Sequence, residues 1–107
     1  MKGQYLGEFE EMLLLLVAIL EKDAYGVNIQ RELKEKADRE TGLSAIHITL
    51  YRLEDKGFVS SYLGEATAVR GGRRKRVFEL THAGHAALEE AREKRAKLWN
   101  LYPGFNA

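Results

Sequence analysis

The chain has 107 residues, of which 45% are hydrophobic and 31% charged, and its formal net charge is +1. This length suits one domain and excludes a large active site with a substrate domain of its own. Because cysteine is absent, disulfides, thiolate metal sites and thiol catalysis are excluded as well. The longest apolar run spans the nine residues 12–20, whereas a membrane-spanning helix needs about 20, so we expect a cytoplasmic protein.

The first predicted element is a helix over residues 8 to about 22, which is apolar on almost every side after an acidic first turn. Carboxylates in a first turn suit the positive end of the helix dipole. A helix without a polar face is buried on several sides, which in so small a domain indicates contact with a second subunit. A second helix is expected over 24–37, with Asp23 as its cap and Gly26 permitting a close helix crossing.

The third predicted helix starts at Ser44, an N-cap candidate, and runs to about residue 56, where Gly57 ends it. At 100° per residue, its apolar face carries Ile46, Leu50 and Leu53. The opposite side combines small, polar, aromatic and cationic residues that the core does not use. These are Ser44, Ala45, Ile48, Tyr51, Arg52 and Asp55, with His47 and Thr49 on the flanks.

A hairpin follows, with strand-type residues over 58–63 and 75–80 and a long glycine-bearing connection between them. Its tip holds five basic residues within seven positions of a nearly neutral chain, namely Arg70, Arg73, Arg74, Lys75 and Arg76. Such a concentrated cationic tip indicates a local anionic partner; the alternative is a solvated tip that keeps a sheet edge soluble. Thr81 then caps a last helix that reaches about Asn100.

The sequence contains no evident catalytic constellation. Gly71-Gly72 stands within a hairpin rather than ahead of a helix, so it is no phosphate cradle, and no Ser, His and Asp suggest a triad. His82, His85 and Glu89 could share one helix face, as a metal site needs, but exposed surface histidines are the preferred interpretation. We therefore expect no enzyme activity, no metal site and no cofactor.

This order of elements predicts a mainly α, α+β fold, the winged helix-turn-helix. Two short helices joined by a polar turn, the second with a polar face that the core does not use, form a helix-turn-helix. The hairpin with its cationic tip then supplies the wing. We expect three helices and a two-stranded wing over residues 1–80, and a C-terminal dimerisation helix and tail over 81–107 of the same compact domain.

Four local stretches carry a resemblance to a known family. They are Ala24-Tyr25-Gly26-Val27, then Thr49-Leu50-Tyr51-Arg52-Leu53-Glu54-Asp55-Lys56-Gly57-Phe58-Val59, then Arg70-Gly71-Gly72-Arg73-Arg74-Lys75-Arg76, and Leu80-Thr81 with Gly84. In order and spacing, over roughly residues 6–88, they resemble the PadR family of bacterial transcription regulators. Where members usually carry a Gly, then a Val or Leu followed by Tyr, this chain has Ser44, Ile46 and His47.

The resemblance implies a winged-helix repressor that dimerises through its last helix and often its first, in a family whose members often respond to small aromatic or amphipathic compounds. We therefore expect a regulator of transcription that binds double-stranded DNA in a sequence-specific manner and is released by a small ligand. Arginine to guanine is the commonest specific contact in the major groove, which favours Arg52 as a base-reading residue. The DNA-binding candidates are Ser44, Ala45, His47, Ile48, Thr49, Tyr51, Arg52, Arg70, Arg73, Arg74, Lys75 and Arg76.

Apolar residues of the first and last helices predict a homodimer, because they would otherwise form a larger exposed patch than soluble monomers usually tolerate. The candidates are Phe9, Met12, Leu13, Leu16, Leu88, Ala91, Leu98, Trp99 and Tyr102. Trp99 is also a minority candidate for contact with an aromatic effector. The alternative function is a winged-helix module whose basic tip grips an acidic protein or RNA without binding an operator.

Overall fold

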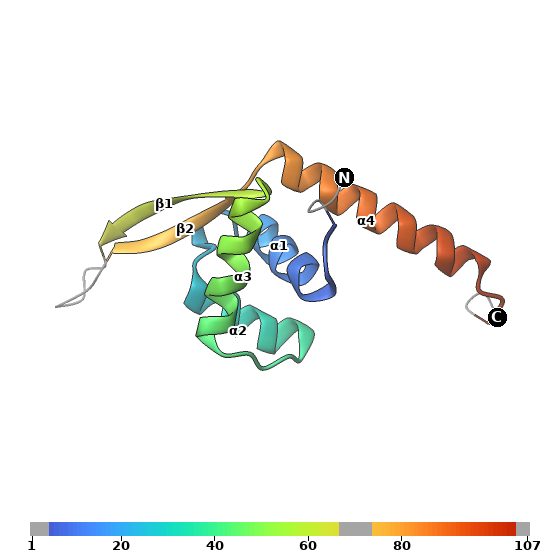
Figure 1. Ribbon diagram of the computed structural model, residues 1–107. Helices are drawn as coiled ribbons and strands as arrows, with labels where there is room; N and C mark the ends of the chain where they lie inside the picture. Colours follow the sequence, from blue (N-terminus) through green and yellow to red (C-terminus); the bar gives the residue numbers. More distant parts are fainter. Residues whose placement is uncertain (1–4, 67–73, 105–107) are drawn as a thin grey trace.

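The structure is a computed structural model that describes residues 5–66 and 74–104 (Figure 1). Its helices and strands come in the expected order. They are α1 (Glu8–Leu20), the short 3₁₀ helix η1 (Glu21–Asp23), α2 (Gly26–Ala37), α3 (Leu43–Asp55), β1 (Val59–Ala66), β2 (Arg74–Leu80) and α4 (His82–Leu101). The two strands pair antiparallel, so the predicted mainly helical class with a two-stranded wing is confirmed.

The core lies between α1, α2 and α3 and is closed by the base of the sheet. The large side chains with at most 2% exposure are Leu13, Leu14, Val17, Ile29, Leu33, Ile46, Leu50, Leu53, Phe58, Val59 and Phe78. Burying a side chain of this size contributes about 1.5–3 kcal/mol. The predicted apolar face of α3 is thus confirmed, and it fixes which face of that helix is left outside.

The end of α3 is set by a glycine, as the sequence predicts. Gly57 has φ +82°, in the left-handed region that residues with a Cβ rarely enter. Its N–H donates to the carbonyl of Glu54 at 2.9 Å, and the N–H of Phe58 donates to the carbonyl of Leu53 at 3.0 Å. These are the two hydrogen bonds of a Schellman motif, and they direct the chain from α3 straight into β1.

The start of α2 differs from the prediction. The η1 turn follows α1, which ends at Leu20, and α2 begins only at Gly26, with Tyr25 rather than Asp23 at the N-cap position. Tyr25 makes no side-chain cap hydrogen bond. The expected Asp23 cap is therefore wrong, because the extra 3₁₀ turn moves the helix start beyond its reach.

The start of α3 also differs, whereas the start of α4 agrees. Helix α3 begins at Leu43, with Gly42 as its N-cap, so Ser44 lies inside the first turn and does not cap the helix. At α4 the expected cap is confirmed, because Thr81 Oγ1 accepts a hydrogen bond from the N–H of Gly84 at 3.0 Å.

Helix α4 is held at its first turn and projects away from the domain at its far end (Figure 1). A Cβ on Gly84 would collide with the carbonyl oxygen of Phe58 and lie 2.8 Å from Leu80 Cδ1, so only glycine fits this approach. At the other end Leu98 is 68% and Leu101 74% exposed. Among the described residues, no helix has both the length and the apolar character needed to cross a membrane.

Candidate nucleic-acid interface

The outer face of α3 presents a mixed polar and apolar surface to solvent. We call Ser44, Ala45, Ile48, Tyr51 and Arg52 the recognition face; all five are exposed. Ile48 and Tyr51 are large side chains that are nevertheless 59% and 46% exposed. No side chain caps the first turn of α3, and amides at a helix N-terminus can bind a phosphate.

Thr49 does not belong to this surface. It is only 5% exposed, and its hydroxyl donates to the carbonyl of Ala45 at 2.9 Å. The expectation that Thr49 contacts DNA is therefore corrected: its position on the flank of α3 turns it toward the inside of the domain.

His47 lies at the edge of the recognition face and packs against the start of α2. Its ring stacks on Tyr51, with centroids 6.3 Å apart and planes at 25°. A Cβ on Gly26 would stand 2.6 Å from His47 Nε2, so glycine at this position allows the close approach of α2 to α3 that the sequence predicts. The imidazole is half-buried, which limits the part of it that a ligand could reach.

Tyr51 connects the recognition face to the wing. Its ring meets the ring of Phe78 in β2 edge to face, with centroids 5.9 Å apart. Such aromatic pairs contribute about 0.5–1.5 kcal/mol beyond their buried area. The base of the wing is therefore packed against the same helix that carries the recognition face.

Polar contacts at the base of the wing use the basic residues that the sequence assigns to DNA. Arg76 Nη1 donates to Ser61 Oγ at 3.0 Å, and the Ser61 hydroxyl donates to Glu54 Oε2 at 2.8 Å. Lys75 Nζ lies 4.3 Å from the centroid of the Tyr25 ring, a cation–π geometry worth about 0.5–1 kcal/mol at an exposed site. These contacts attach β2 to α3 and to the start of α2.

Arg74 lies further out and folds back on β1. Its Nε donates to the carbonyl of Gly64 at 2.8 Å and its Nη2 to that of Leu63 at 3.2 Å. A register irregularity lies between Leu63 and Ala66, and such bulges increase the twist of a hairpin. The other two basic candidates, Arg70 and Arg73, lie outside the described residues.

The turn between α2 and α3 carries an exposed ion pair. Lys34 Nζ lies 2.9 Å from Glu40 Oε2. This hydrogen bond lowers the pKa of the Glu40 carboxyl and raises the pKa of the Lys34 ammonium. Because both side chains are solvated, the pair contributes little to the stability of the fold.

The predicted dimer surface needs a correction on α1. Leu13 is fully buried and Leu16 is 8% exposed, because both face the chain's own core, so neither is available to a second subunit. Phe9 and Met12 are partly buried against that core. The exposed large apolar residues of α1 are instead Leu15 and Ile19, at 43% and 66%. Their spacing of four places them on one side of the helix, but no polar residue in the apolar run marks that side in the sequence.

Helix α4 keeps its apolar candidates at the surface. Leu98, Trp99 and Tyr102 are 68%, 51% and 54% exposed, whereas Leu88 and Ala91 are half-buried. Trp99 and Tyr102 contact each other, with ring centroids 6.0 Å apart. The structure therefore leaves an apolar end on α4 that the described chain does not cover.

A groove of about 570 Å³ runs between α1 and α4. Its apolar lining includes Leu15, Ala18, Leu80, Leu88, Ala96 and Trp99. His85 stands at this groove and pairs with Glu89 at 3.4 Å. Within the described part of the chain, no three His, Cys, Asp or Glu side chains are grouped to hold a metal ion.

The chain is similar to a known protein family and to individual proteins. A model of the family described as "Transcriptional regulator PadR-like family" matches residues 14–90. Uncharacterized protein X of Lysinibacillus sphaericus is 32% identical over 79 residues, which are 72% of this chain and 70% of that protein.

Two solved structures show how far the similarity extends in three dimensions. The X-ray structure of a PadR-like transcription factor from Bacteroides fragilis is similar with a TM-score of 0.73 and 27% identity, over 92% of this chain and 89% of that chain. Bacillus subtilis PadR in complex with operator DNA is similar in fold, with a TM-score of 0.59 and 22% identity, over 78% of this chain and 45% of that chain.

Proposed function

Because the chain belongs to the PadR-like family of transcriptional regulators, we propose that it is a homodimeric repressor that binds double-stranded DNA in a sequence-specific manner. As a member of this family it is a regulator and not an enzyme. The observation that carries the proposal is the recognition face of α3, an exposed mixed surface beside a basic wing. The Bacillus subtilis relative with the same fold is held on operator DNA, which supports this choice of partner.

The recognition face and the wing have different tasks in this proposal. In a helix-turn-helix protein the second helix lies in the major groove. Arg52 would read a base, while Ser44, Ala45, Ile48 and Tyr51 fit the groove around it. Basic residues of the wing would hold phosphates or enter the adjacent minor groove, which positions the protein without reading most bases.

The second subunit would cover the apolar surfaces of α1 and α4. Leu15 on α1 lines the groove between α1 and α4, and Ile19 on α1 and Leu98 on α4 are further large apolar side chains exposed to solvent. A twofold dimer would bury them in both copies and present two equivalent recognition faces. Residues 1–80 would then form the DNA-binding part and residues 81–107 the dimerisation part.

A small ligand would act at the dimer surface rather than at the DNA. The groove between α1 and α4 is mostly apolar and contains Trp99, which suits a small aromatic or amphipathic compound. A ligand bound there would change the orientation of the two subunits relative to each other and so release the operator. We propose the cytoplasm as the location of the protein.

A salt titration tests the proposal directly. Fluorescence anisotropy with labelled duplex from upstream of the protein's own gene, and with random duplex of equal length, should show tighter binding to the former. The logarithm of affinity should fall linearly with the logarithm of salt concentration on both. Equal affinity for the two duplexes would refute sequence specificity, and binding to RNA or an acidic protein alone would favour the interaction-module alternative.

A further inference from the structure

The first turn of α1 holds three other elements of the fold at once. We call its carboxylates Glu8, Glu10 and Glu11 the acidic turn. Each pairs with a cation from a different element: the turn before α3, the end of α3, and α4. The pairs are Glu8 with Arg39, Glu10 with Lys56, and Glu11 with Arg95, at 3.1, 2.9 and 2.6 Å between nitrogen and oxygen.

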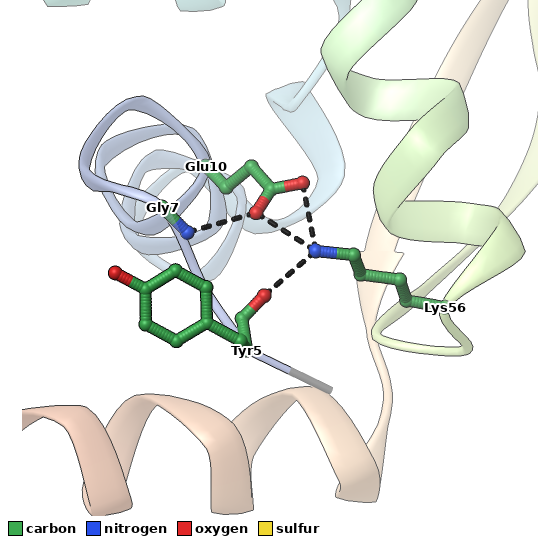
Figure 2. Close-up of polar contacts among 4 residues, drawn as sticks. All are labelled: Tyr5, Gly7, Glu10 and Lys56. Carbon is green, nitrogen blue, oxygen red and sulfur yellow. Dashed lines mark hydrogen bonds and ion pairs between the residues drawn. The ribbon is translucent and has the colours of Figure 1, made fainter. Parts of the chain in front are cut away.

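The pair between Glu10 and Lys56, drawn in Figure 2, has the least exposed side chains of the three. Lys56 Nζ lies 2.9 and 3.0 Å from the two carboxylate oxygens of Glu10 and 2.7 Å from the carbonyl oxygen of Tyr5. Glu10 Oε1 also accepts from the N–H of Gly7 at 2.9 Å. The side chains of Glu10 and Lys56 are only 9% and 18% exposed, so solvent screens this pair little.

Arg39 holds the end of α2 to the same turn. Its guanidinium lies 4.7 Å from the centroid of the Phe9 ring and contacts Met12 Sδ at 3.6 Å, in addition to Glu8. Arg39 follows the end of α2, where its N–H donates to the carbonyl of Leu33 at 3.3 Å, and Lys56 is the C-cap residue of α3, so the acidic turn anchors the ends of both helices on α1. The contact of Arg95 with Glu11 then ties α4 to the turn that holds α3.

The helix dipole alone does not account for this arrangement. A carboxylate in the first turn interacts favourably with the dipole wherever its side chain points. Here all three side chains reach cations that belong to other elements, and one of those cations, Lys56, ends the recognition helix. Glu8 and Arg95 are largely exposed and exposed pairs contribute little, so the mechanical connection rests mainly on Glu10 and Lys56.

We propose that Glu10 and Lys56 are positioning residues for DNA recognition: they fix the orientation of α3 relative to α1 and thereby set the distance between the two recognition helices of a dimer that forms through α1 and α4. This inference rests on the proposed function. Neither residue needs to touch DNA for this role. Their loss would leave the sequence of each half-site unchanged and relax the spacing between half-sites.

The first experiment measures the distance between the two α3 helices without DNA. Because the chain has no cysteine, Ser44→Cys accepts a single nitroxide per subunit, and electron–electron double resonance then gives one distance distribution. We expect a narrow distribution in the parent, broadened by Lys56→Met and by Glu10→Gln, which keeps the oxygen that accepts from Gly7. An unchanged width in both variants, or a protein without a second subunit, would overturn the proposal.

Lys36→Met is the matched control. It makes the same chemical change and removes an ion pair with Glu32 at 3.1 Å that lies within α2, so it connects no two elements. The width of its distance distribution should equal that of the parent. Equal broadening in Lys36→Met and Lys56→Met would show a general effect of lost charge and would overturn the proposal.

The second experiment selects binding sites from a random-sequence duplex library. The parent and Lys36→Met should recover two half-sites at one spacing, whereas Lys56→Met and Glu10→Gln should recover the same half-sites with loss of the spacing preference. A sharp spacing retained in both variants would overturn the positioning role. If the parent recovers no duplex at all, the proposed function fails, while the spin-label distances still decide whether the acidic turn orients α3.

Discussion

Arg52 offers the sharpest test of how the recognition face works. It is exposed on α3, and within the part of the chain that the structure describes its guanidinium forms no ion pair or hydrogen bond. Arg52→Ala should therefore change the free energy of unfolding by no more than about 0.5 kcal/mol. On the operator it should cost about 1–3 kcal/mol of binding free energy, with relaxed discrimination at one base position.

The salt dependence separates a base contact from a phosphate contact. Each phosphate contact contributes about 0.9 to the log–log salt slope, so a dimer in which Arg52 holds phosphates would lose about 1.8 of slope in Arg52→Ala. A base contact leaves the slope nearly unchanged while specific affinity falls. Arg31→Ala on α2, also an exposed arginine, controls for the loss of charge. Equal weakening of operator and random duplex by Arg52→Ala would refute the assignment of Arg52 to base reading.

Three further predictions concern the wing, the start of α4 and the dimer. If about three cations of each wing reach phosphates, the log–log slope of affinity against salt concentration on duplex DNA should be near −5. Replacing Arg73 and Arg74 by Ala should flatten this slope to roughly −2. A variant that melts like the parent and keeps the parent's slope would show that the wing does not touch DNA. Gly84→Ala should destabilise the fold by about 1–3 kcal/mol in urea unfolding, because its methyl group meets the carbonyl of Phe58; unchanged stability would mean that α4 can move aside. Light scattering should report a dimer that Leu98→Asp converts to monomer, and a monomeric parent would refute the interface.

Local rules were enough to predict α3 and its end. The spacing of Ile46, Leu50 and Leu53 identifies the buried face, and Gly57 marks the position where a left-handed residue is needed. Both depend on neighbours within one or two helical turns. The helix starts at Gly26 and Leu43 were not predictable in the same way, because neither has a side-chain cap.

Contacts between elements are not visible in the sequence. In the apolar run of α1 no polar residue marks the outer side, so the pattern does not distinguish the buried Leu13 from the exposed Leu15. The carboxylate of Glu10 was explained by the helix dipole because its partner Lys56 is far away in the sequence. Likewise, nothing near Lys75 indicates that the ring of Tyr25 lies beneath its ammonium group.

The Schellman motif at Gly57 makes the connection short between α3 and the wing, the two parts of the protein that are proposed to contact DNA. Phe58 follows it directly, and its carbonyl oxygen accepts from the N–H of Thr81 at 3.1 Å, so the end of α3 and the start of α4 are joined through one peptide group. In the proposed complex, this connection would set the distance from the major-groove contact of α3 to the base of the wing. Operators would then diversify through side chains on α3, whereas a single residue inserted after Gly57 would shift the wing relative to α3.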